Sequence, residues 1–119
     1  MPLRKLVDRV TKGVDESDRE ALAAFCDDLD GLVHLDRLPL RVPGRFGGEI
    51  TSVRIVPRAG APALEVTVSD GRGSVVAVFL GRRKIAAMKP GRRLIAEGVA
   101  TARGPERLVY NPWYRFLPR

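Results

Sequence analysis

The chain has 119 residues, of which 45% are hydrophobic and 29% are charged. These fractions are close to those of an average folded protein, so they exclude disorder as the default and allow a core without disulfides or metals. The length suits one domain with at most one appended element. The net charge of +7 favours an anionic partner, with nucleic acid as the first candidate.

Basic charge is concentrated in the second part of the chain. Residues 1–40 contain six basic and nine acidic side chains, whereas residues 41–119 contain fifteen and five. The lone cysteine, Cys26, cannot form an intramolecular disulfide. The sequence has no apolar run of about 18 residues and no apolar signal core after Met1, so we expect a cytoplasmic protein without a membrane segment.

Two helices are predicted before the β pattern begins. Apolar side chains recur at spacings of three and four from Leu3 to Val14, the period of a helix with one apolar face. A second helix is expected from Asp18 to Leu29, followed by a connector that contains prolines. Beyond this connector the hydrophobic period changes to two. We therefore divide the chain into a helical segment with its connector, residues 1–40, and a β domain, residues 41–119.

The β domain is predicted to start with a strand from Glu49 to Val56. Ile50 and Val53 have opposite parity in this strand, which indicates a β-bulge near Thr51 and strong local curvature. The following segment, residues 57–63, contains Gly60 and two prolines, and is predicted to form a loop.

A hairpin is expected around Asp70-Gly71-Arg72-Gly73, between strands over residues 64–69 and 74–80. Pairing about this turn places Ser69 opposite Ser74. One face then carries the core side chains Leu64, Val66, Val68, Val75, Ala77 and Phe79. The other face combines Val76, Val78 and Leu80 with Glu65 and Thr67, which is too apolar for a solvated face. We therefore expect the N-terminal helices, another subunit or a ligand to cover it.

Composition predicts a short helix over residues 82–89, with Ile85 and Met88 three positions apart and Pro90-Gly91 after it. A fourth strand is expected over residues 93–100. A fifth begins at residues 108–110, before Asn111-Pro112 interrupts it. The order of three strands, one helix and two strands is that of the mainly β, five-stranded OB-fold Greek-key barrel.

Particular segments of the predicted barrel carry a family resemblance: Gly48–Val53, Val66–Gly73, Pro90-Gly91 with Gly98, and Leu108–Pro112. Together they resemble nucleic-acid-binding OB-folds of the anticodon-binding and RecG-wedge type. The chain is also similar to small actinobacterial proteins described as OB-fold nucleic-acid-binding-domain proteins, through Phe79-Leu80-Gly81-Arg82-Arg83 and Tyr110-Asn111-Pro112. The resemblance implies binding of single-stranded or structured DNA or RNA, without catalysis.

Basic side chains flank the predicted groove of this barrel, where we expect them to follow a phosphate backbone. They are Arg54, Arg58, Arg82, Arg83, Lys84, Arg92, Arg93, Arg103 and Arg107. Tyr110, Trp113 and Tyr114, with Arg115 beside them, add rings that can stack on bases. The alternatives are an ordinary solvated surface for the charges and burial for the rings. Burial is favoured for Phe46, Phe79 and Phe116.

The sequence predicts no enzyme and no metal or cofactor site. His34 has no cysteine or carboxylate at metal-ligand spacing, and Asp70 and Glu97 lack partners for acid–base catalysis. Cys26 is expected to be a small buried hydrophobe. Nucleic-acid binding is the main hypothesis. The alternative is a protein-interaction or oligomerisation module that uses the apolar outer face of the barrel.

Overall fold

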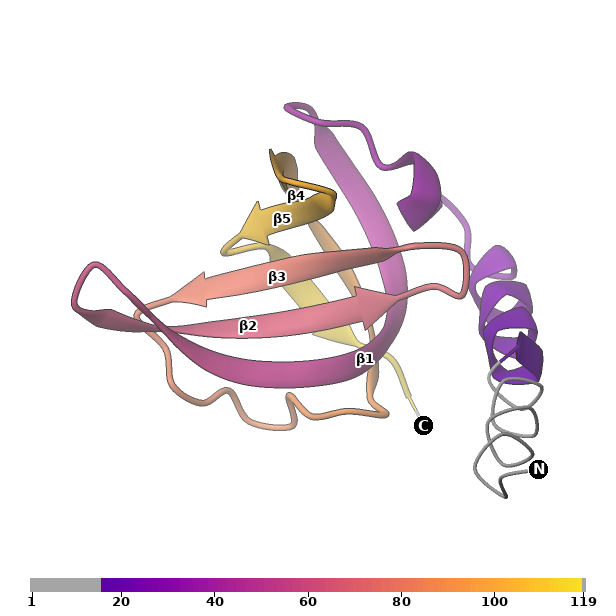
Figure 1. Cartoon of the computed structure of the whole chain (residues 1–119). Helices are drawn as coiled ribbons and strands as arrows, with labels where there is room; N and C mark the ends of the chain where they lie inside the picture. The colour runs from indigo at the N-terminus through magenta and orange to yellow at the C-terminus, as the bar shows by residue number, and fades with distance from the viewer. Residues whose placement is uncertain (1–15, 119) are drawn as a thin grey trace, which may run out of the picture.

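Six strands follow one helix in the computed structural model, which describes residues 16–118 (Figure 1). The helix covers residues 16–27, and a 3₁₀ turn, η1 (Leu35–Arg37), comes after it. The strands are β1 (Pro43–Arg58), β2 (Ala61–Ser69), β3 (Ser74–Leu80), β4 (Arg93–Arg103), β5 (Glu106–Tyr110) and β6 (Trp113–Phe116). The helix predicted from Leu3 to Val14 lies outside the described residues. Within them, no helix is both long and apolar enough to cross a membrane.

Five of the strands close into a ring, in the order β1-β2-β3-β5-β4 with β4 pairing back onto β1. Neighbours in the ring are antiparallel except β3 and β5, which pair in parallel. β6 follows β5 after Asn111-Pro112 and pairs with β4. This ring has the strand order of the OB-fold, so the predicted mainly β, five-stranded fold is confirmed.

β1 contributes to both sides of the ring because it bends in the middle. Residues 43–49 pair with β4, and residues 49–58 pair with β2. The register of the second pairing shifts between Ile50 and Ser52, so the predicted bulge at Thr51 is confirmed. The strand begins at Pro43 rather than at Glu49, because β4 pairs with the preceding glycine-containing segment as well.

The prediction of a loop over residues 57–63 is wrong. β1 and β2 continue to Arg58 and Ala61, which pair with each other. Only Ala59 and Gly60 connect them, and their φ angles of 49° and 80° are those of a tight hairpin turn whose twist suits the two strands. The sequence lacks the Asn-Gly or Asp-Gly pair that normally marks such a turn.

The β2–β3 hairpin has the predicted register, with Ser69 opposite Ser74 and Leu64 opposite Phe79. The side chains assigned to its inner face all belong to the main core, as predicted. The core also contains Phe46 and Ile50 from β1, Leu94, Ala96 and Ala100 from β4, and Val109 from β5. The alternation of side chains along each strand therefore determines which residues fill the ring.

The helix predicted between β3 and β4 is absent, because residues 81–92 form an irregular segment of turns. Ala87 has a φ angle of 65°, which a right-handed helix does not allow. Ile85 and Met88 are nevertheless buried in the core, and the amide of Met88 donates to the carbonyl of Ile85. One turn thus closes the ring from this side without a regular helix.

The helix packs against the end of the β2–β3 hairpin (Figure 1). A Cβ atom at Gly71 would overlap the carbonyl oxygen of Arg19, so only glycine permits this approach. Arg72 makes two hydrogen bonds to Asp27 of the helix, at 3.0 and 2.8 Å. Cys26 is buried, as predicted. The helix over residues 16–27 therefore lies at one end of the ring, beside the β2–β3 turn.

The connector after the helix contributes to the same core as the strands. Leu35 and Leu38 are both buried in it. Asp70, in the β2–β3 turn, accepts a 2.8 Å hydrogen bond from the amide of Leu35 through Oδ2. Its Oδ1 accepts from the amides of Arg72 and Gly73, both at 2.9 Å. One buried carboxylate thus joins the connector to the hairpin.

Candidate nucleic-acid interface

A buried carboxylate lies on the outer face of β2. Leu64 and Val66 point into the core, so the alternation of the strand directs Glu65 to the opposite face. Glu65 is only 2% exposed to solvent. A charge in such a place needs partners that compensate for its lost hydration, and the neighbouring strands supply them.

Three arginines converge on Glu65. Arg54, its cross-strand partner in β1, donates to Oε1 at 3.2 Å, and Arg58 donates to Oε2 at 3.2 Å. Arg103, at the end of β4, contacts both oxygens at 3.4 Å. We call these four residues the Glu65 cluster. Its three positive charges exceed its one negative charge, so this part of the outer face stays basic.

The cluster also determines the protonation state of its carboxylate. Burial alone raises the pKa of Glu65, but hydrogen bonds from Arg103, Arg58 and Arg54 outweigh burial and hold this pKa below its ordinary value. The same contact, together with Glu106, raises the pKa of Arg103. Both sides of the cluster are therefore charged at neutral pH.

Tyr110 extends the cluster along β5. Its ring is 5.5 Å from the guanidinium of Arg58, and its hydroxyl accepts a 3.2 Å hydrogen bond from Arg58 Nη1. The residue is 40% exposed. The β1–β2 turn follows Arg58 directly, and the β4–β5 turn follows Arg103. The cluster and Tyr110 thus lie next to the β1–β2 and β4–β5 turns.

The apolar outer face of the hairpin is buried by the chain itself. Val76 and Val78 form a second buried cluster with Ala63 of β2 and Leu108 of β5. No second subunit or ligand is needed to bury Val76 and Val78, because Leu108 of β5, the strand beside β3, packs with them and the side chains of the Glu65 cluster lie on the same face. The helix predicted from Leu3 to Val14, another expected cover, lies outside the described residues. Only Leu80 of the three predicted apolar residues remains exposed.

The remaining predicted basic residues are distributed over other parts of the ring. Arg82, Arg83 and Lys84 are exposed in the irregular segment after β3. Arg92 packs on the ring of Phe116 at 4.5 Å, and Arg93 packs on the ring of Phe25 at 4.3 Å. These residues do not join the Glu65 cluster.

Arg107 and the aromatic residues of β6 have separate surroundings. Arg107 donates a 2.7 Å hydrogen bond to the carbonyl of Leu38. Tyr114 points inward and makes edge contacts with Phe79 and Phe116, at centroid distances of 5.5 and 5.6 Å. Trp113 is 50% exposed under the guanidinium of Arg45, and Arg115 is exposed beside it. Tyr114 is therefore partly buried against the core, whereas Trp113 is exposed.

Four of the predicted site residues, Arg54, Arg58, Arg103 and Tyr110, are thus brought together. Glu65, which holds three of them, was not predicted as a site residue. The signal was its outward position in a strand whose neighbour carries Arg54 directly opposite. Arg103 gives no such signal, because it reaches Glu65 only when the ring closes.

Comparisons with known proteins identify the fold. No family model matches the chain, and no curated protein matches it. Among solved structures, one of RecG bound to a three-way DNA junction matches with a TM-score of 0.60 and 16% sequence identity. The match covers 74% of this chain but only 12% of the RecG chain. This chain is therefore similar in fold to a small part of a much longer protein.

Proposed function

We propose that this protein binds single-stranded or structured DNA or RNA, without catalysis, through the Glu65 cluster and Tyr110. The observation that carries the proposal is the convergence of Arg54, Arg58 and Arg103 on one buried carboxylate, beside an exposed tyrosine. In OB-folds, oligonucleotides bind on the face of strands 2 and 3, between the turns that join strands 1–2 and 4–5. The cluster lies on this face.

The geometry suits a phosphate backbone with unstacked bases. Glu65 holds the three guanidinium groups in place before any ligand arrives, which reduces the entropy lost on binding. Each guanidinium has five N–H donors, so one carboxylate cannot occupy them all. Tyr110 offers an exposed ring for base stacking, worth about 1 to 3 kcal/mol per base.

Two further facts support the proposal. Residues 41–119, which include the whole ring, contain fifteen basic and five acidic side chains. The structure with a similar fold is that of a protein bound to a DNA junction. Arg82, Arg83 and Lys84 are exposed in the segment after β3, and we include them as secondary contacts for a longer strand.

The alternative of a protein-interaction or oligomerisation module has less support. It was based on three apolar residues of the outer face, and two of them, Val76 and Val78, are buried within the chain. Leu80 alone is too small a contact to define an interface.

Fluorescence anisotropy of a labelled single-stranded oligonucleotide, measured over a range of salt concentrations, tests the proposal. The double variant Arg54→Gln/Arg103→Gln should weaken binding and reduce the slope of log affinity against log salt by about 1.4, since each phosphate contact to a single strand contributes about 0.7. Arg19→Gln, which removes a cation from the helix, is the matched control and should leave the slope unchanged. Equal slopes for the double variant and the wild type would contradict the proposal.

A further inference from the structure

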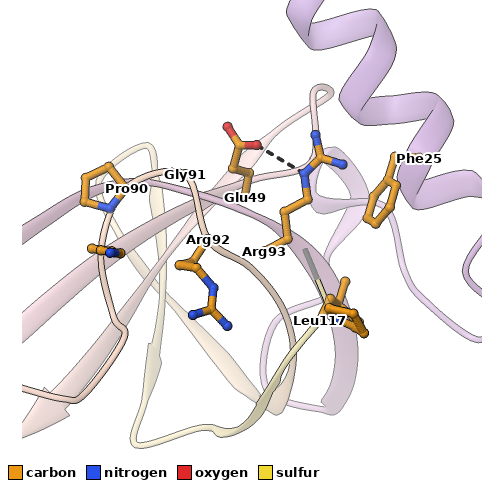
Figure 2. Close-up of a pocket in the computed structure, with 9 residues that line it drawn as sticks. Phe25, Glu49, Pro90, Gly91, Arg92, Arg93 and Leu117 are labelled. Atoms are coloured by element: carbon orange, nitrogen blue, oxygen red, sulfur yellow. Dashed lines mark hydrogen bonds and ion pairs between the residues drawn. The ribbon is translucent and has the colours of Figure 1, made fainter.

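A second basic site lies on the other side of the Thr51 bulge. It is a pocket of about 480 Å³ between the helix, the first half of β1, the start of β4 and the C-terminal segment (Figure 2). This volume is within the range of small-molecule sites. None of the residues of the Glu65 cluster lines it.

One side of the pocket is basic. Lys89, Arg92 and Arg93 line it, and Glu49 is its single acidic residue. Arg93 donates through Nε to Glu49 at 3.1 Å, and its guanidinium lies between Glu49 and Phe25 (Figure 2). Lys89 and Arg92 thus have no carboxylate partner among the residues that line the pocket, so the pocket attracts an anion.

Arg92 has a buried donor that the described part of the chain leaves without an acceptor, as Arg58 does outside the pocket. Its Nε atom is buried and has no hydrogen-bond partner within residues 16–118. Buried donors without a partner are uncommon in native structures. Arg92 lines the pocket with its guanidinium 4.5 Å from the centre of the Phe116 ring, so an anion in the pocket reaches this Nε donor once the side chain shifts off that ring.

The basic side is held in a fixed position. The amide of Gly91 donates to the carbonyl of Ile50, and the amide of Ile50 donates to the carbonyl of Arg92, at 2.9 and 2.8 Å. The amide of Leu117 donates to the carbonyl of Arg93 at 2.9 Å. These bonds connect three separate segments of the chain, so the pocket exists before a ligand binds.

The other side of the pocket is apolar, and this restricts the class of ligand. Phe25, Leu117 and Pro118 line it. A simple inorganic anion would leave these side chains in contact with water, and an apolar ligand would remove water from unpaired cations. One carboxylate is too few for a divalent metal ion. The combination suits a phosphate group attached to a flat or apolar body.

We propose that this pocket binds a nucleoside 5′-phosphate, with the phosphate on Lys89 and Arg92 and the base against Phe25, Leu117 and Pro118. Such a group occurs in a free mononucleotide and at the phosphorylated end of a nucleic-acid strand. The site adds to the proposed function, but does not depend on it, because none of the proposed contacts of the Glu65 cluster is shared.

Calorimetry on the full chain with adenosine 5′-monophosphate, adenosine and inorganic phosphate tests the pocket. The monophosphate should bind at least tenfold more tightly than either fragment. Lys89→Gln and Arg92→Gln should each weaken it several-fold, and Arg37→Gln, a cation of η1 outside the pocket, should not. Lys89 is exposed, so its variant remains informative if Arg92→Gln does not fold. Equal affinity for the monophosphate and adenosine, or no effect of Lys89→Gln, would overturn the proposal.

Anisotropy with oligonucleotides that differ only in their 5′ end shows whether the pocket binds a free mononucleotide or the phosphorylated end of a strand. Tighter binding of the 5′-phosphorylated oligonucleotide, lost in Lys89→Gln, assigns the pocket to strand ends. Binding of the free monophosphate, with no preference for the phosphorylated oligonucleotide, assigns it to a mononucleotide. Arg54→Gln/Arg103→Gln should reduce binding of the 5′-hydroxyl oligonucleotide and leave calorimetry with the monophosphate unchanged, so failure of one site is distinguishable from failure of the other.

Discussion

The guanidinium of Arg58 lies 3.2 Å from the carboxylate of Glu65, on a face where two further arginines contact the same group. Glu65 is almost fully buried, whereas Arg54 and Arg103 remain partly exposed. Without this carboxylate, three positive charges, two from β1 and one from β4, would lie close together with no negative charge between them. Glu65 is therefore an anchor that allows arginines to gather on one surface.

Glu65→Gln should lower the free energy of unfolding by roughly 2 to 4 kcal/mol, because a buried charged acceptor is replaced by a neutral amide. Urea denaturation at neutral pH measures this change. Glu97→Gln is a suitable control, since Glu97 is half exposed and its ion pair with Arg45, at 3.7 Å, is a surface pair worth less than about 1 kcal/mol. Similar losses in both variants would contradict the role of Glu65 as an anchor.

The contribution of Glu65 should also depend on pH. Its pKa in the folded chain is lowered, so its stabilisation is complete above the ordinary glutamate pKa of 4.5 and is lost as the pH falls through the lower folded value. The difference in unfolding free energy between wild type and Glu65→Gln should therefore be full at neutral pH and shrink below that value. Denaturation curves of both proteins across this range measure the difference. A constant difference would show that packing, not charge, is lost.

Asp70 should be as important for the fold as Glu65 is for the outer face. Asp70→Ala removes the acceptor of three amides, from Leu35, Arg72 and Gly73, and we expect a loss of about 3 kcal/mol or more in unfolding free energy. Asp70→Asn is the matched variant. Its oxygen can still accept from the turn, but its amino group then faces the amide of Leu35, so its loss should be smaller. An Asn variant as unstable as the Ala variant would disagree with this account.

The two faces of β3 should respond differently to truncation. Phe79 is 7% exposed and contacts the ring of Tyr114, so Phe79→Ala should cost about 3 to 5 kcal/mol. Leu80 is 45% exposed, so Leu80→Ala should cost less than about 1 kcal/mol. Thermal or urea denaturation of the pair measures both. Equal large losses would mean that a partner covers Leu80 in solution.

The β2–β3 hairpin could be predicted from the sequence because its signals are local. The alternation from Leu64 to Ser69 and the Asp-Gly turn together fix the register. β1 was predicted only in part, because Gly47 and Gly48 carry no strand signal. Their small size has a tertiary reason: a Cβ atom at Gly48 would overlap the carbonyl of Ser69, and one at Gly47 would press on Leu32.

The site was predicted less completely than the fold for a related reason. Arg54 and Glu65 are neighbours in one hairpin, but Arg103 is 38 residues from Glu65 in the chain. Their contact exists only because β4 closes the ring. The helix predicted over residues 82–89 failed for another reason. Burying Ile85 and Met88 needs only one turn, and within that turn Ala87 has a φ angle of 65°, which a right-handed helix does not allow.

The segment after β3 should add to nucleic-acid affinity without affecting the fold. Arg82 and Arg83 are both exposed there, so Arg82→Gln/Arg83→Gln should unfold like the wild type. It should bind a long single-stranded oligonucleotide more weakly, with a log–log salt slope reduced by about 1.4. Anisotropy with a long and a short oligonucleotide measures this, and only the long one should detect the change. No loss with either would exclude this segment from the interface.

The fluorescence emission of Trp113 should change when a bound nucleic-acid strand extends past Tyr110. Both residues are exposed, and they lie on either side of Asn111-Pro112, where the chain leaves β3 and continues along β4. The chain turns at Asn111, whose φ angle is 48°, and three residues span at most about 10 Å, so a strand that stacks on Tyr110 can reach the indole with its next bases. Because Trp113 is the only tryptophan, its emission can be followed without a label. A saturating oligonucleotide should quench it, whereas a dinucleotide that occupies only the Glu65 cluster should not.

Trp113→Ala should weaken binding of the long oligonucleotide by about 1 to 3 kcal/mol and leave the unfolding free energy nearly unchanged. Unchanged emission at saturation, with binding confirmed by anisotropy, would place the strand on another path.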